Sequence, residues 1–423
     1  MNIRILIACC SLAWIPAFSQ KLTLAEASAL ALKNNPRIRL DALAPLIANE
    51  SVTGISAALY PTINVQSTAA AALTDSRLAA GALNNPIIFS RLAFGASASQ
   101  LLTDFGRTAN LVESAKLRAD SQLQFVQATR AQILLAVHRA FYSALRARKV
   151  KQVAEKTLSA RQLLLDQVST LAKNGLRSTL DVSFAEVNVS EAMLSAVTVQ
   201  NELDGALAEL SALLGYPQPQ RFDLVEPDLD SDQPPVATEW IFEAMRNRPE
   251  VAALRLERES AARYAKAEEK LSMPTIAAVG NAGVAPFHTD RLNRRFAAAG
   301  VTFNLPLFNG HLFDARKREA QLRLQAVDQR LKELENAVAR EVTLVALNAN
   351  TAYQRIALTA QLARQAGLTV ELAQERYNLG LSSFVELSQA QLNLTAAEIR
   401  NAAARYDYQL VRSTIEFQLG RLR

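Results

Sequence analysis

The chain contains one layout twice, and this internal repeat limits what it can fold into. Early in the chain the matching positions lie 213 residues apart, and from residue 115 onwards they lie 205 apart. The pairs that mark the repeat are Pro36 and Pro249, Pro61 and Pro274, Gly175 and Gly380, and Gly215 and Gly420. A unit of about 200 residues is too long for a solenoid repeat. We therefore expect two similar halves, the first with a longer loop between residues 63 and 115.

Residues 1–19 are predicted to be a secretory signal peptide. A polar start with Arg4 precedes an apolar run from Ile5 to Trp14 and small residues up to Ser19, which is the usual order in such signals. Both cysteines, Cys9 and Cys10, fall inside this segment. The exported chain is therefore expected to have no thiol for a disulfide, a metal site or nucleophilic catalysis.

Composition indicates an ordered protein without affinity for nucleic acid. Half of the residues are hydrophobic and 20% are charged, which is typical of folded chains. The net charge of +6 is spread along the chain, and no basic cluster is interleaved with aromatic residues. Beyond the signal, we expect no apolar run long enough for a membrane-spanning helix.

Each half is predicted to begin with a helix and continue into a β-hairpin. Pro36 and Pro249 stand where a helix of about 24 residues can begin, and Pro61 and Pro274 end it. Alternation of apolar and polar residues then predicts hairpins over residues 60–102 and 273–307. The expected turns are Asn84-Asn85-Pro86 in the first hairpin and a loop containing Pro286 in the second.

Two long helices follow, over residues 104–173 and 309–378, because these stretches lack proline and nearly lack glycine. Apolar residues at steps of three and four predict that they form coiled coils. Gly175 and Gly380 end them, and Ser178 and Ser383 open capping boxes for return helices over residues 178–214 and 383–419. The proline-rich residues 216–237 are predicted to link repeat 1 (20–215) to repeat 2 (238–420).

Four strands cannot close a barrel by themselves. Single-chain outer-membrane barrels need about eight strands or more, and open strand edges are not tolerated in lipid. If these strands lie in a membrane, several chains have to share one barrel.

In this layout the chain resembles the TolC family of outer-membrane efflux channels over essentially its whole mature length. The residues that carry the resemblance are the helix starts at Pro36 and Pro249, the strand starts at Pro61 and Pro274, and the hairpin tips 174–178 and 379–383. It implies a mainly α fold with a small β part: a long antiparallel coiled-coil helical barrel plus four strands of a trimeric transmembrane β-barrel, internally duplicated.

The resemblance further implies a homotrimer in outer-membrane lipid that extends into the periplasm. It would act as the exit duct of a tripartite efflux or type I secretion system, passing substrates from an inner-membrane pump and a periplasmic adaptor to the exterior.

The family's functional positions can be carried over residue by residue. The docking tips for the adaptor match Gly175, Leu176, Arg177, Gly380, Leu381 and Ser382, and the periplasmic gate matches Asp181, Tyr377, Glu386 and Gln389. This chain has Gln389 at a second acidic position and Ser382 at a basic partner position, which departs from the family's locking network. Plainer roles are also open: C-terminal helix caps for the glycines, capping for the two acids and core packing for Tyr377.

No catalytic, metal or cofactor motif is found. The three histidines, His138, His288 and His311, are isolated and lack ligand spacing. A channel is the preferred function, a periplasmic coiled-coil scaffold outside the membrane is the second, and an exported hydrolase is a distant third.

Overall fold

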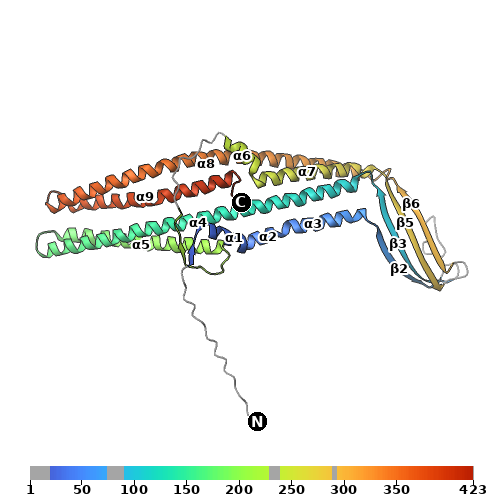
Figure 1. Cartoon of the computed structure of the whole chain (residues 1–423), viewed down its shortest axis with the longest axis horizontal. Helices are drawn as coiled ribbons and strands as arrows, with labels where there is room; N and C mark the ends of the chain where they lie inside the picture. Colours follow the sequence, from blue (N-terminus) through green and yellow to red (C-terminus); the bar gives the residue numbers. More distant parts are fainter. Residues whose placement is uncertain (1–19, 74–89, 228–238, 288–292, 423) are drawn as a thin grey trace, which may run out of the picture. The chain divides into compact units, whose positions relative to one another are not determined.

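The computed structural model describes residues 20–73, 90–227, 239–287 and 293–422. The predicted signal peptide, the Asn84-Asn85-Pro86 turn, His288 and most of the second half of the linker lie outside these residues. The predicted fold class is confirmed: the described chain is mostly helical, with a four-stranded sheet and two similar halves (Figure 1). It divides into two compact units, each described here by itself. Unit 1 comprises Met1–Arg39, Thr129–Asn247 and Val338–Arg423, and unit 2 comprises Leu40–Ala128 and Arg248–Ala337.

Unit 2 contains the sheet, in the order β2-β3-β5-β6, with every neighbouring pair antiparallel. The strands are β2 (Thr62–Ala70), β3 (Arg91–Thr103), β5 (Thr275–Phe287) and β6 (Arg295–Asn304). Thus each half of the repeat supplies one hairpin, and β3 and β5 join the two.

The two faces of this sheet differ in chemistry. Directly paired residues share a face, so the register assigns every side chain to one side. One face carries most of the large exposed apolar residues, namely Ile63, Val65, Phe94, Val284, Val301 and Phe303, with Gln100 and Arg295 among them. The other face carries most of the polar residues, namely Asn64, Gln66, Ser97, Ser99, Asn281 and Thr302, together with Val279 and Phe296.

The structure corrects the position of Pro286, which was expected in a loop and instead lies inside β5. Ala285 and Pro286 together face the single residue Ala93, because the register shifts between Leu92 and Phe94. A β-bulge accepts proline because the extra residue needs no ladder hydrogen bond.

The opening helix of the first half is also divided differently from the prediction. It consists of α2 (Pro36–Asp41), α3 (Leu43–Ser56) and a 3-10 turn, η1 (Ala57–Leu59). In the second half, α7 (Pro249–Glu269) begins at its proline as expected.

One segment overturns the expectation that only the signal is apolar enough to cross a membrane. The segment Pro36–Leu59 has 24 residues, and an 18-residue window within it has a mean hydropathy of 1.2, with 6% of that window buried. Glu50 is the one charged residue between Ala42 and Leu59, so the mean hydropathy of this stretch stays high although it also contains uncharged polar residues. Length and composition alone are weak evidence for a span.

Helices α4 (Arg107–Lys173) and α8 (Leu312–Asn378) pass through both units. In unit 2 a buried carboxylate ties their first turns to the end of α7. Glu268 is 2% exposed. Arg316 Nη2 donates a hydrogen bond to Glu268 Oε1 at 3.2 Å. Arg316 Nε also lies 2.8 Å from Glu268 Oε2, where the two groups form an ion pair without the alignment of a hydrogen bond. Arg107 Nη2 lies 3.7 Å from the same carboxylate. One buried charge thus connects three helices.

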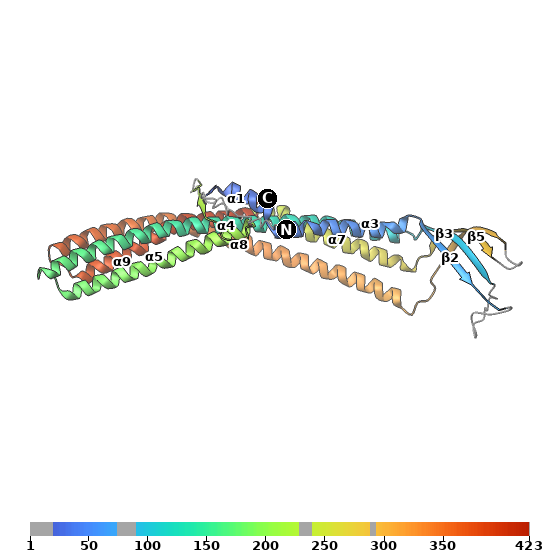
Figure 2. The same cartoon turned by 90° about the horizontal axis from the view of Figure 1, so that it is seen from below.

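Unit 1 contains two helical hairpins, in which α5 (Thr179–Leu213) returns beside α4 and α9 (Phe384–Gln418) returns beside α8 (Figures 1 and 2). Two further helices were not predicted: α1 (Leu24–Asn34) and α6 (Trp240–Asn247). A capping box of Thr23 and Glu26 opens α1, and this Thr-x-x-Glu pattern was readable in the sequence.

A parallel strand pair, also not predicted, lies beside these helices. Strand β1 (Gln20–Leu22) pairs with β4 (Phe222–Leu224) in the linker. Arg148 Nη1 of α4 donates to the carbonyl of Leu224 at 2.8 Å, and the Tyr406 hydroxyl of α9 donates to Glu226 at 2.5 Å. The described part of the linker is therefore bound to the helices.

His138 of α4 lies between α1 and α9. Its Nε2 is 3.4 Å from the Ser28 hydroxyl and its Nδ1 is 3.2 Å from the Ser413 hydroxyl. Burial lowers the pKa of His138 below its usual value of 6.5, because the imidazolium is desolvated there.

We expect this histidine to make the protein less stable in acid. A lowered folded-state pKa means that the unfolded chain binds the proton more readily. The contribution is therefore complete above about pH 6.5 and is lost as the pH falls through the lower folded-state pKa. His138→Gln should flatten the decline of the thermal midpoint between pH 7.5 and pH 5, whereas the exposed His311→Gln should keep the wild-type profile. Identical profiles for all three proteins would contradict the assignment.

Candidate functional site

The two hairpin tips have the same backbone. Gly175 has a φ of 68° and Gly380 a φ of 75°, the left-handed conformation that favours glycine. The amide of Leu176 donates to the Leu171 carbonyl at 2.9 Å, and the amide of Leu381 donates to the Arg376 carbonyl at 2.8 Å. These bonds close each long helix and direct the next leucine outward. Leu176 is 69% exposed and Leu381 is 67% exposed.

Serines open both return helices, but the predicted capping boxes are incomplete. The Ser178 hydroxyl accepts from the amide of Leu180 at 3.1 Å, not from Asp181, whose amide donates to the Ser178 carbonyl. The Ser383 hydroxyl accepts from Glu386 at 3.3 Å. Among the described residues the reciprocal carboxylate bond forms at neither tip.

The second tip is anchored in the core of unit 1 by two aromatic residues. Tyr377 is 3% exposed and Phe384 is 2% exposed, and their ring centroids lie 5.7 Å apart in a T-shaped arrangement. Their neighbours come from both hairpins and include Leu164, Val168, Ala185 and Leu387. The first tip has Ala172 and Thr179 at the equivalent repeat positions. The aromatic pair therefore belongs to one tip only, which the repeat comparison could have revealed.

Arg177 of the first tip contacts Tyr377 of the second. Its guanidinium carbon lies 4.0 Å from the centre of the tyrosine ring, and its Nη2 donates to the Tyr377 carbonyl at 2.5 Å. Burial raises the pKa of Tyr377; the positive charge of Arg177 opposes this and the negative charge of Asp181 adds to it. The structure therefore brings Arg177, Asp181 and Tyr377 together.

The remaining predicted gate residues lie apart from this cluster. The Glu386 carboxylate is 3.6 Å from Arg376 Nε, and both side chains are exposed. Gln389 donates to Asn393 along its own helix at 3.1 Å. The buried hydroxyl of Ser382 has no hydrogen-bond partner in the described part of the chain. Arg376 was not singled out by sequence reasoning, although it lies in the last turn of α8 next to Tyr377.

Nothing in this arrangement resembles a catalytic or metal centre. Within the described ranges, no group of three or more His, Cys, Asp or Glu side chains could hold a metal ion. The tips instead present exposed leucines, a buried tyrosine, the exposed carboxylate of Glu386 and the half-buried carboxylate of Asp181.

Family comparison agrees with this geometry. Residues 27–216 and 240–421, in both halves of the repeat, match the family model described as outer membrane efflux protein. This chain belongs to that family. The resemblance to TolC proteins is thereby confirmed.

The chain is also similar to curated members of this family and to solved structures. Outer membrane protein TolC of Salmonella enteritidis is 23% identical over 300 residues, which are 69% of this chain and 61% of the relative, less than two thirds of its length. Outer membrane protein TolC of Vibrio cholerae is 23% identical over 396 residues, 92% of this chain and 88% of the relative. The structure of CusC, reported with transmembrane channel formation, matches with a TM-score of 0.82 at 20% identity, over 94% of this chain and 92% of CusC.

Membership of the outer membrane efflux protein family places the chain in the outer membrane. A scaffold that never enters the membrane does not fit this location. The relatives are channel proteins rather than enzymes.

We predict that Arg177→Gln loosens the contact between the two tips. The variant loses the guanidinium over the Tyr377 ring and a charged hydrogen bond, a bond that contributes about 1.5–3 kcal/mol. Hydrogen exchange of amides near residues 377–384 should then accelerate roughly tenfold or more, since about 1.4 kcal/mol corresponds to a factor of ten. Lys173→Gln, which removes an exposed cation from the same tip, should leave the exchange unchanged. Equal protection in both variants would show that Arg177 does not hold the tips together.

Proposed function

We propose that this protein is the outer-membrane exit duct of a tripartite efflux or type I secretion system. It would pass substrates delivered by an inner-membrane pump and a periplasmic adaptor to the exterior. The observation that carries the proposal is the four-stranded sheet with one exposed apolar face, in a chain of the outer membrane efflux protein family.

The sheet gives a physical reason for oligomerisation. Among the described residues, strands β2 and β6 each have a neighbour on one side only, so their outer edges carry backbone groups that no described strand pairs. Such edges are too costly in lipid, because no water is present to satisfy them. Three chains arranged in a ring would supply twelve strands, pair β2 of one chain with β6 of the next and turn the apolar faces towards lipid.

Exposed apolar residues on the helices also indicate contact between copies of the chain. Large apolar side chains are exposed at steps of three, four and seven residues on α5, and in pairs three or four residues apart on α8. On α5 these include Leu180, Phe184, Val187 and Leu194, and on α8 the pairs Leu344 and Leu347, Leu358 and Leu362, and Leu368 and Leu372. Apolar residues at this spacing are typical of coiled-coil seams, which need a partner helix. A homotrimer would bury them, together with Leu40, Leu43, Leu46 and Ile47.

The first prediction from this function is an obligate trimer. Native mass spectrometry of the detergent-extracted protein should give particles of three chains, and these should conduct ions in planar bilayers. A monodisperse, water-soluble monomer would contradict both the shared barrel and the duct.

The tips are proposed to dock the periplasmic adaptor through Leu176 and Leu381, with Gly175, Arg177, Gly380 and Ser382 shaping the surface. Replacing both leucines with glutamate should abolish cross-linking to the adaptor, because a carboxylate cannot be buried in an apolar contact without a partner. The trimer should persist. Gln361→Glu, which adds a charge to an exposed site on α8 away from the tip, is the matched control. Undiminished cross-linking and export in the leucine variant would exclude docking at this surface.

The carboxylates of Asp181 and Glu386 are proposed to form an acidic ring at the periplasmic mouth. Threefold symmetry would repeat each acid around one axis, where negative charge favours cations. Asp181→Asn and Glu386→Gln should therefore reduce cation preference and block by trivalent cations. Glu398→Gln, further along α9, should not change either property. Selectivity equal to wild type in both tip variants would assign these acids to Arg376 pairing and Tyr377 packing alone.

A further inference from the structure

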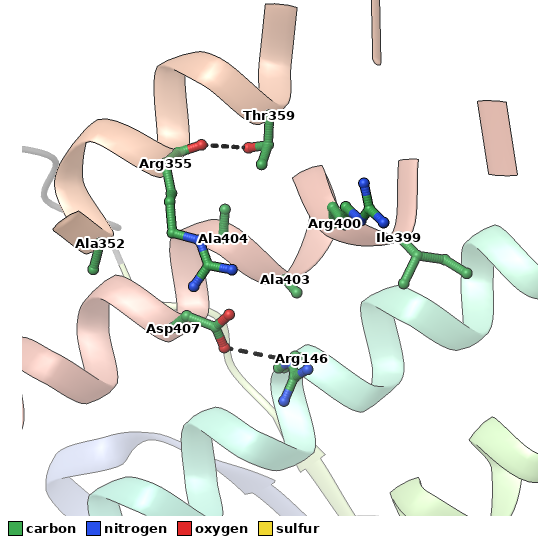
Figure 3. Close-up of a pocket in the computed structure, with 9 residues that line it drawn as sticks. All are labelled: Arg146, Ala352, Arg355, Thr359, Ile399, Arg400, Ala403, Ala404 and Asp407. Atoms are coloured by element: carbon green, nitrogen blue, oxygen red, sulfur yellow. Dashed lines mark hydrogen bonds and ion pairs between the residues drawn. The ribbon is translucent and has the colours of Figure 1, made fainter. Parts of the chain in front are cut away.

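A hollow of about 190 Å³ lies between α4, α8 and α9 in unit 1, apart from the hairpin tips (Figure 3). Small residues leave this space open, because Ala352, Ala403 and Ala404 stand where larger side chains would fill it. The remaining lining residues are Arg146, Arg355, Thr359, Ile399, Arg400 and Asp407.

The lining is strongly positive. Each of the three helices contributes one arginine to the lining: Arg146 from α4, Arg355 from α8 and Arg400 from α9. Asp407 is the one carboxylate among the lining residues, and its Oδ1 lies 3.5 Å from Arg146 Nε. Three positive charges and one negative charge leave an excess of two.

Two of these arginines are not neutralised within the described part of the chain. Neither Arg355 nor Arg400 has an ion pair there, and the bond from the Thr359 hydroxyl at 2.7 Å goes to the backbone carbonyl of Arg355. Figure 3 shows the Arg355 side chain reaching from α8 towards Asp407 on α9 and Arg146 on α4. Arg146, Arg355 and Arg400 are all exposed, so water and salt screen part of their mutual repulsion, and an anion between them would remove more of it.

We propose that this hollow binds a small doubly charged oxyanion, phosphate or sulfate, that ties α4 to the α8–α9 hairpin. Guanidinium groups match oxyanions well, since their planar forks donate paired hydrogen bonds. The charge of the anion equals the excess of the lining. The space is sufficient, because each water occupies about 30 Å³ and the hollow therefore holds roughly six. This site depends on the fold of unit 1 and does not require the proposed duct function.

The test is calorimetric titration of the full-length protein in detergent with sodium phosphate and, separately, sodium sulfate, in chloride buffer at constant ionic strength. Wild type should bind saturably with one site per chain. Arg355→Gln and Arg400→Gln should each raise Kd about tenfold or more, since each removes a charged hydrogen-bonding group. Asp407→Asn should lower Kd, because it removes the one carboxylate that competes with the anion.

Arg364→Gln is the matched control, because it removes an exposed arginine of α8 that does not line the hollow. Its Kd should equal that of wild type, and circular dichroism should confirm that every variant is folded. Absence of saturable binding to wild type would overturn the proposal. An equal loss of binding in Arg364→Gln would also overturn it, as would selective capture of an acidic partner protein with no response to either anion.

Discussion

The unpaired edges of β2 and β6 are the constraint on which the rest of this structure depends. Each edge presents backbone donors and acceptors that water satisfies in solution and that lipid cannot satisfy. One face of the same sheet exposes apolar side chains such as Val65 and Phe303, which favour lipid over water. These two demands are met together only if other strands close the edges. The proposed ring of three chains would supply such strands.

The helices also expose apolar side chains that need a partner. Their inner apolar residues are packed within each unit, whereas other large apolar residues of α5 and α8 remain exposed in a single chain. Polar contacts add to this packing at particular points. Glu268 joins three helices in unit 2, and Arg148 and Tyr406 hold the linker in unit 1. Charged groups therefore help to fix the positions of the elements, while exposed apolar residues supply the area for association.

The tips show how a duplicated chain acquires different halves. Both turns use the same glycine geometry, yet only the second has the Tyr377 and Phe384 pair in the core. Arg177 of the first tip covers Tyr377, and the equivalent repeat position in the second tip is the uncharged Ser382. The contact between the hairpins is therefore asymmetric, and a substitution in one tip should not have the effect of its counterpart in the other.

The sequence by itself determined the duplication, the four strands, the long helices and the glycine turns. These follow from local rules: proline starts and stops helices, alternation marks strands, and Gly175 and Gly380 satisfy positive backbone angles. The Thr-x-x-Glu pattern of Thr23 and Glu26 is also a local signal for the start of α1, although α1 was not predicted from it. Tertiary structure decided the rest. The bulge at Pro286 depends on the register against β3, and the Arg177 contact with Tyr377 joins residues 200 positions apart. The arginine-lined hollow depends on three helices meeting, because Arg146, Arg355 and Arg400 come from α4, α8 and α9.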